Sequence, residues 1–112
     1  MRNSPSIVPG MPVDVTVFAV LDDLGSFGRV WREVDKNAAD EATVIRNIIE
    51  SQYERPVQVV AFNTAEGWSR DVTEDVARSV VEKARTEKIE LPDSARDFYA
   101  WATGEDLSVG VL

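Results

Sequence analysis

The sequence contains neither cysteine nor histidine among its 112 residues. Disulfide bonds, thiol nucleophiles, serine–histidine–aspartate triads and zinc sites built from these ligands are therefore excluded. Glycine-rich phosphate-binding motifs are missing as well. We accordingly expect no catalytic residue, no cofactor and no metal site. The absence of these residue types and motifs favours a protein that is not an enzyme.

Basic residues are also scarce. Twelve lysines and arginines against 20 aspartates and glutamates give a formal net charge of -8. Such a surface repels the phosphates of nucleic acids and of anionic lipids, so we expect no nucleic-acid and no membrane partner. The charge instead favours a protein partner with a basic surface. Neither a signal-peptide pattern nor an 18-residue apolar stretch is found, which predicts a cytoplasmic location.

The length and a hydrophobic content of 44% suit one small α+β domain. Residues 1–12 contain three prolines and one glycine, so we expect a flexible leader there. The domain is expected over residues 13–104. Residues 105–112 form an apolar C-terminal tail, which either adds to a sheet edge as a strand or packs loosely on the body.

Three segments have the composition of β-strands. Residues 13–21 alternate and become apolar on both faces, which predicts a central strand in a sheet covered on each side. Residues 29–34 follow a segment rich in turn formers and predict the second strand of a hairpin. Residues 57–62 are apolar and rich in valine, which predicts a third strand. We expect Asp22 and Asp23 to be solvated carboxylates of the hairpin loop.

Apolar residues at helical spacing predict three helices, with stripes between residues 42 and 53, 72 and 84, and 95 and 102. Asn37 and Asp40 are alternative N-caps of the first helix, which we expect to end near Tyr53 because Pro56 prevents its continuation. The second helix begins at a cap on Asp71 or Thr73. The third begins near Pro92 and ends at Gly104.

The predicted element order is β-β-α-β-α-α. A right-handed connection places the third strand parallel to the second, on the far side of the first. This gives a three-stranded mixed sheet of spatial order 2-1-3, packed by three helices. Three helices cover one face of such a sheet more readily than both, so the tail, the third helix or a second copy of the chain is left to cover the rest. A homodimer is thus one of the open alternatives.

One candidate site is the predicted loop over residues 63–71, between a central strand and the start of a helix, where ligands bind in many α/β sheets. Arg70 would hold an anion, Glu66 would act as a general base and Trp68 would stack on the ligand. The candidate ligand-binding residues are Asn63, Thr64, Glu66, Trp68, Ser69 and Arg70. In the structural alternative, Trp68 caps the core, Ser69 or Asp71 caps the helix, and Asn63 shapes the turn.

A second candidate site is the aromatic hairpin. Phe27 lies at the expected hairpin tip and Trp31 on the strand that follows. If that strand is an edge, the two aromatic residues flank the place where a partner would add. The alternative for Trp31 is packing in the core.

The function that these observations favour is a non-catalytic protein-interaction or regulatory module, acting through a strand edge, the aromatic hairpin and an acidic surface. The alternative is a small domain that binds an anionic ligand, or a modest enzyme, using the 63–71 loop.

Overall fold

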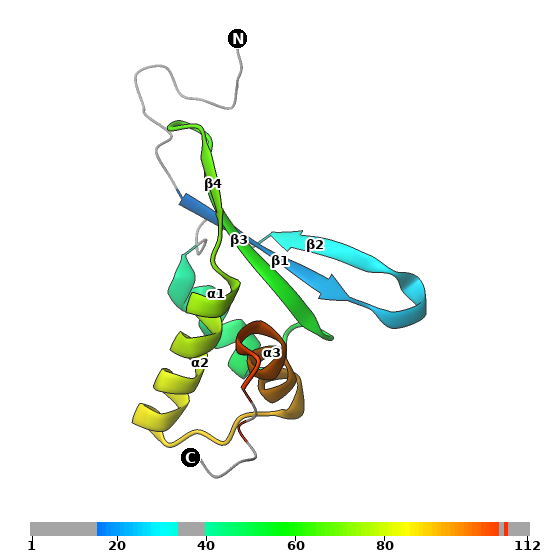
Figure 1. Ribbon diagram of the computed structural model, residues 1–112, viewed down its shortest axis with the longest axis vertical. Helices are drawn as coiled ribbons and strands as arrows, with labels where there is room; N and C mark the ends of the chain where they lie inside the picture. Colours follow the sequence, from blue (N-terminus) through cyan, green and yellow to red (C-terminus); the bar gives the residue numbers. More distant parts are fainter. Residues whose placement is uncertain (1–15, 34–39, 106, 108–112) are drawn as a thin grey trace.

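The computed structural model describes residues 16–33, 40–105 and 107. The predicted leader, residues 1–12, and residues 106 and 108–112 of the predicted tail lie outside the described residues. Three helices and one sheet confirm the α+β class (Figure 1). The elements in chain order are β1 (Thr16–Asp23), the 3-10 turn η1 (Gly25–Phe27), β2 (Arg29–Glu33), α1 (Glu41–Ile49), β3 (Pro56–Asn63), β4 (Trp68–Asp71), α2 (Thr73–Glu87) and α3 (Asp93–Thr103).

The sheet has four strands in the order β2-β1-β3-β4, and every neighbouring pair is antiparallel. The predicted three-stranded mixed sheet of order 2-1-3 is therefore wrong, as is the element order β-β-α-β-α-α. Residues 68–71 form β4 where the sequence indicated a polar loop. Strands β2 and β3 do run in the same direction, but β1 lies between them, so no parallel pair forms.

The hydrophobic core lies between one face of the sheet and the three helices. Phe18 and Val20 of β1 and Val59 of β3 point into it, as the alternation of a strand requires. The helices contribute, among others, Ile48 from α1, Val76 and Val80 from α2, and Ala95 and Phe98 from α3. Leu107, in the predicted tail, is buried in the same cluster.

The opposite face of the sheet differs from the expectation for β1. Ala19, Leu21, Val60 and Phe62 alternate with the core residues, and in the described part of the chain none of them belongs to the core cluster. Strand β1 is central, as predicted, with β2 and β3 on its two sides. Among the described residues, the core cluster covers one face of β1, and on the other face only the end of α3 comes near, where Trp101 and Ala102 line a hollow with Leu21.

The helix ends follow local chemistry. Asp40 caps α1 by accepting a hydrogen bond from Thr43 N at 2.9 Å, which decides between the two candidate caps. Helix α1 ends at Ile49, earlier than predicted. The N-cap of α2 is Val72, so neither candidate cap is correct, although the Asp71 carboxylate accepts from the amide of Thr73. Gly104 ends α3 with a φ of 76°, in the left-handed region that glycine adopts readily.

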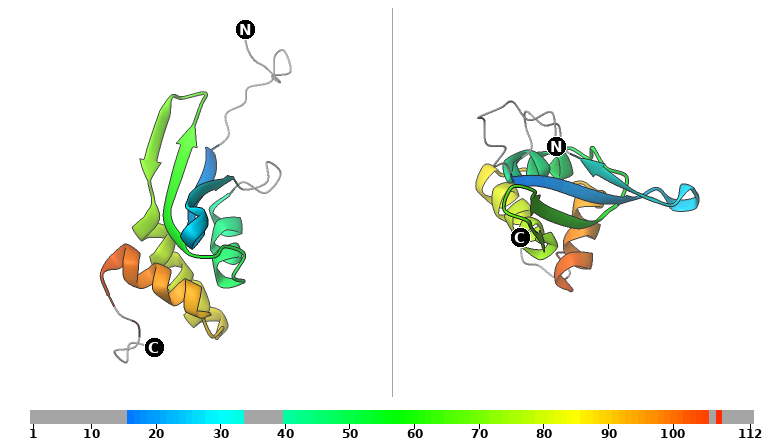
Figure 2. Two further views of the ribbon diagram at one scale, coloured as in Figure 1. Left: turned by 90° about the vertical axis from the view of Figure 1, so that its right-hand side faces the viewer. Right: turned by 90° about the horizontal axis from the view of Figure 1, so that it is seen from above.

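Both hairpins extend beyond the helices. In Figure 1 the β1–β2 hairpin projects to the right and the β3–β4 hairpin upward. In Figure 2 the left view shows the β3–β4 hairpin rising beyond the helices, and the right view shows the β1–β2 hairpin extending beyond them. The sheet therefore has one edge at β2 and the other at β4, both lying away from the core.

Candidate interaction surface

Strand β2 is the clearest candidate for a binding surface. It stands at the end of the sheet and pairs only with β1 among the described strands. All five of its residues are exposed. A strand with one unpaired side presents backbone donors and acceptors in a regular row, and another strand can add to that row.

The register of the hairpin shows which backbone groups face outward. Leu24 N donates to the carbonyl of Gly28 at 2.8 Å, which makes these two residues a hydrogen-bonded pair. In an antiparallel ladder such pairs alternate with pairs that exchange no hydrogen bond. The next pair, Asp23 with Arg29, therefore exchanges no hydrogen bond. Asp23 N instead donates to the carbonyl of Arg55, just before β3, at 3.0 Å. By the same alternation, the amides and carbonyls of Arg29, Trp31 and Glu33 point away from β1.

The side chains of β2 divide between two faces. Arg29, Trp31 and Glu33 lie on the face that carries Leu21, opposite the core cluster, and Leu21 and Arg29 line a hollow there together with Trp101 and Ala102 of α3. Trp31 is 52% exposed, so the alternative that it packs in the core is wrong. Phe27 is 87% exposed in η1, at the tip of the hairpin. The structure thus brings both predicted partner-binding residues onto one hairpin, with only Trp31 on the edge strand.

Asp22 anchors this hairpin to the rest of the domain. Its carboxylate is fully buried and accepts hydrogen bonds from Glu54 N at 3.0 Å and Arg55 N at 2.7 Å. It also accepts from Nη1 of Arg32 at 3.0 Å, and this guanidinium lies 5.5 Å from the centre of the Tyr53 ring. The expected solvated carboxylate is wrong for Asp22, because β1 continues through it and directs its side chain to the amides before β3.

Beside the hairpin lies a hollow of about 250 Å³, lined among others by Asp23, Arg29, Arg55 and Trp101. The Trp101 indole donates from Nε1 to the carbonyl of Val57 at 2.9 Å. A hydrogen bond from the Gly25 amide, together with Arg29, lowers the pKa of Asp23 below its ordinary value. Within the described part, Asp23 is the ion-pair partner of Arg29, at 3.5 Å, whereas Arg55 forms no ion pair.

The predicted ligand-binding loop is the β3–β4 hairpin. Asn63 is buried, and its Oδ1 accepts from Glu66 N at 2.8 Å while its carbonyl accepts from Gly67 N at 2.9 Å. Trp68 donates from Nε1 to Glu66 Oε1 at 2.7 Å, and the Arg70 guanidinium lies 5.9 Å from the Trp68 ring centre. Four of the six proposed ligand-binding residues, Asn63, Glu66, Trp68 and Arg70, therefore already contact another member of the set.

The remaining members of that prediction are Thr64 and Ser69, which are both exposed. The contacts of Asn63 are those of the structural alternative, in which this residue shapes the turn. Trp68 does not cap the core, because it lies on β4 and is 37% exposed.

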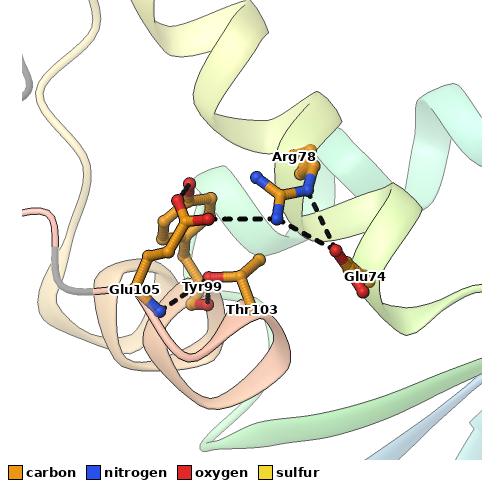
Figure 3. Close-up of polar contacts among 5 residues, drawn as sticks. All are labelled: Glu74, Arg78, Tyr99, Thr103 and Glu105. Carbon is orange, nitrogen blue, oxygen red and sulfur yellow. Dashed lines mark hydrogen bonds and ion pairs between the residues drawn. The ribbon is translucent and has the colours of Figure 1, made fainter.

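A polar cluster joins α2 to the end of α3 (Figure 3). Tyr99 Oη donates to Glu105 Oε1 at 2.7 Å, and Arg78 Nη2 donates to Glu105 Oε2 at 3.2 Å. Arg78 also pairs with Glu74 at 2.9 Å. The hydrogen bond from Tyr99, together with Arg78, lowers the pKa of Glu105, and the same hydrogen bond raises the pKa of Tyr99. Arg78 pairs with both carboxylates of the cluster, so these contacts connect α2 to the end of α3.

The sequence predicted the aromatic residues of the candidate surface but missed Arg29, Glu33 and Trp101.

Residues 16–33, 40–105 and 107 contain no group of three acidic side chains able to hold a metal ion. None of the helices in these ranges is both long and apolar enough to cross a membrane. Comparison with protein-family models, with curated proteins and with solved structures finds no match.

Proposed function

We propose that this chain is a non-catalytic protein-interaction module that binds its partner by strand addition at β2. The observation that carries the proposal is the exposed edge strand, in which the backbone groups of Arg29, Trp31 and Glu33 face away from β1. Main-chain hydrogen bonds would supply affinity, and the side chains that alternate along the strand would supply specificity.

Trp31 is suited to be the anchor of such an interface. Tryptophan and arginine are the residues that most often carry binding energy, and Trp31 stands at the middle of β2 with Arg29 and Glu33 on the same face. The two arginines of β2 pair with Asp22 and Asp23 of the neighbouring strand, so the hairpin adds no positive patch to a chain of net charge -8. The acidic surface would speed the encounter with a partner that carries basic groups around its docking strand.

The hairpin is also held in place before any partner binds. The buried Asp22 ties β1 and β2 to the segment that precedes β3 through two backbone amides and Arg32. A preorganised edge loses less conformational entropy on binding than a loop that must first become ordered. This supports β2 as a binding strand.

The test is quantitative affinity purification of the tagged full chain from its natural host, with wild type compared with Trp31→Lys. A lysine in the middle of an edge strand opposes the addition of another strand. The matched control is Trp68→Lys, which places the same substitution on β4, at the other edge of the sheet. Circular dichroism establishes that both variants are folded.

We expect proteins that co-purify with wild type to be lost with Trp31→Lys and retained with Trp68→Lys. Loss with Trp68→Lys alone would move the interface to β4. Equal recovery with all three chains would show that neither edge binds these proteins, and the proposal would be wrong.

A second candidate function is the binding of a small anionic ligand in the hollow beside the hairpin. The observation that favours it is the position of Arg55 beside the aromatic ring of Trp101; Arg55 forms no ion pair in the described part, although the carboxylates of Asp23 and Asp97 also line the hollow. Nuclear magnetic resonance titration with inorganic phosphate and with acetate tests it. Shifts at Arg55 and Trp101 that disappear in Arg55→Gln would support binding, with Arg85→Gln on α2 as the control; no shifts would exclude it.

A further inference from the structure

We propose that the strand that adds to β2 is β2 of a second copy, antiparallel, with a two-fold axis between the two Trp31 residues. This inference rests on the proposed function, because it uses the same edge and names the occupant. It joins the two four-stranded sheets of the described residues into one sheet of eight strands, with the core clusters of both copies on the same side.

The backbone selects this register. Hydrogen-bonded pairs in an antiparallel ladder form between residues whose amides and carbonyls both point to the partner. On the free side of β2 these residues are Arg29, Trp31 and Glu33. A two-fold axis at Trp31 pairs Trp31 with Trp31 of the second copy, and Arg29 with Glu33 of the second copy. This arrangement uses every outward amide and carbonyl of the strand.

The side chains agree with the same register. Arg29 of each copy lies directly opposite Glu33 of the other, on one face of the new sheet. Opposite charges directly across a ladder stabilise it, and like charges destabilise it. Asp23 already contacts Arg29 from the neighbouring strand at 3.5 Å, so Arg29 would stand between two carboxylates. The two indoles meet at the centre, where aromatic cross-strand pairs are favourable.

The other face of the strand contains no conflict. Here Val30 lies opposite Arg32 of the second copy, and Arg32 is already neutralised by Asp22 at 3.0 Å. Val30 is 39% exposed in the single chain, and the aliphatic part of an arginine side chain can cover it. No pair of like charges is therefore opposed in this register.

The opposite edge of the sheet shows that this complementarity is specific to β2. On β4, Val72 N donates to Val59 O at 2.9 Å, so by alternation Ser69 and Asp71 present their backbone groups outward. The two-fold register that pairs Ser69 with Asp71 of another copy brings Arg70 directly opposite Arg70. Self-pairing of β4 in this register would place two positive charges together, whereas the register of β2 that uses all of its outward groups places opposite charges together.

The experiment is a charge exchange read out as molecular mass, by analytical ultracentrifugation of the full chain over a range of concentrations. Moderate salt is used because it screens the repulsion between two chains of net charge -8. We expect wild type to shift reversibly from monomer to dimer as its concentration rises. Arg29→Glu places two glutamates opposite each other twice per dimer, and Glu33→Arg places two arginines opposite each other, so each variant alone should stay monomeric.

The decisive sample is an equimolar mixture of Arg29→Glu and Glu33→Arg. In this mixture every opposed pair carries opposite charges again, so we expect a heterodimer from two chains that do not self-associate. The double variant carrying both substitutions should form a homodimer. Arg85→Glu on α2 changes the net charge as Arg29→Glu does and should leave dimerisation intact, because it lies away from β2. A monomeric wild type, or a dimer that neither exchange affects, would overturn the inference.

Cross-linking provides a readout that does not depend on charge. The chain has no cysteine, so Trp31→Cys introduces a single thiol at the two-fold axis, where Cα atoms of a hydrogen-bonded pair lie about 5.5 Å apart, within disulfide range. Oxidation should yield a covalent dimer. Val30→Cys should not, because residue 30 lies opposite residue 32. Equal cross-linking of both variants would refute the register.

The two proposals fail separately. A monomeric wild type that still loses its co-purified proteins with Trp31→Lys would refute the dimer and leave β2 as a binding strand for another protein. A dimer that follows the charge exchange supports both proposals.

Discussion

Arg32 donates from Nη1 to the Asp22 carboxylate at 3.0 Å, although only Asp22 of the two is buried. The guanidinium remains 44% exposed and lies over the ring of Tyr53, which is a buried core residue. The ion pair therefore lies between the core and solvent. Because two backbone amides also donate to Asp22, its two oxygens accept three hydrogen bonds. This carboxylate thereby joins β1, β2 and the segment that precedes β3.

Replacement of Asp22 by asparagine should destabilise the protein strongly. The amide NH2 group cannot accept a hydrogen bond, so at least one buried donor loses its partner, and the Arg32 guanidinium loses its counter-charge. Losses of this kind cost about 2–4 kcal/mol. The free energy of unfolding in urea measures the effect.

Asp23→Asn is the control for this substitution. Its Oδ1 would still accept from the Gly25 amide, and only the partly exposed ion pair with Arg29 would be lost. We expect a loss below about 1 kcal/mol. Similar losses at both positions would contradict the assigned role of Asp22.

The periodic elements of this fold were predictable from the sequence, and β4 was not. The strand at β1 and the stripes of α2 and α3 bury side chains at a regular spacing, and this spacing is visible in the residues. Strand β4 buries none of its four side chains, and it is held by pairing with the backbone of β3. Without an apolar alternation, nothing in Trp-Ser-Arg-Asp distinguishes an edge strand from a loop.

The candidate surface was predictable in its aromatic residues only. Phe27 and Trp31 are large apolar residues in or next to a turn-rich segment, which suggests a partner-binding hairpin but leaves open whether Trp31 is exposed or packs in the core. The roles of Arg29 and Glu33 depend on which backbone groups face outward, and this is set by the hairpin register. The burial of Asp22 was missed for a similar reason. The predicted strand ended at residue 21, whereas β1 continues through Asp22 and pairs it with Val30, which makes Asp22 a buried strand residue and not a solvated loop residue.

Trp101→Phe should lower stability by about 1 kcal/mol, the usual net value of one hydrogen bond. The ladder between β1 and β3 shifts register between Leu21 and Asp22, and the Trp101 indole donates to the carbonyl of Val57 beside this irregularity. Phenylalanine retains the ring but not the donor. Trp31→Phe is the comparison, because the Trp31 indole has no hydrogen bond within the described part. Thermal unfolding of the two variants side by side would reveal a difference, and identical melting temperatures would count against this role for the indole.

Gly67→Ala should destabilise the β3–β4 hairpin by about 1 kcal/mol, because Gly67 has a φ of 74° and a Cβ atom disfavours this region. Nothing lies within 4 Å of the position of that Cβ, so the cost comes from the backbone and not from a clash. Gly67→Asn should cost less, since asparagine adopts left-handed conformations more readily. Hydrogen exchange of the β4 amides measures the local effect. An alanine variant as protected as wild type would show that the turn has another conformation.

Acid should weaken the link between α2 and α3 through Glu105. The hydrogen bond from Tyr99 and the charge of Arg78 lower the pKa of Glu105 in the folded chain, below the value of about 4.3 for a free glutamate. A lowered folded pKa means that the unfolded chain takes up the proton first as the pH falls. The stabilisation from Glu105 is therefore fully present above the unfolded pKa and is lost as the pH falls through the folded pKa. Glu105→Gln should be less stable than wild type at pH 7, and the difference should shrink steadily below about pH 4.3. Urea unfolding over this pH range measures both chains, and a difference that stays constant into acid would show that the carboxylate charge has no part in the link.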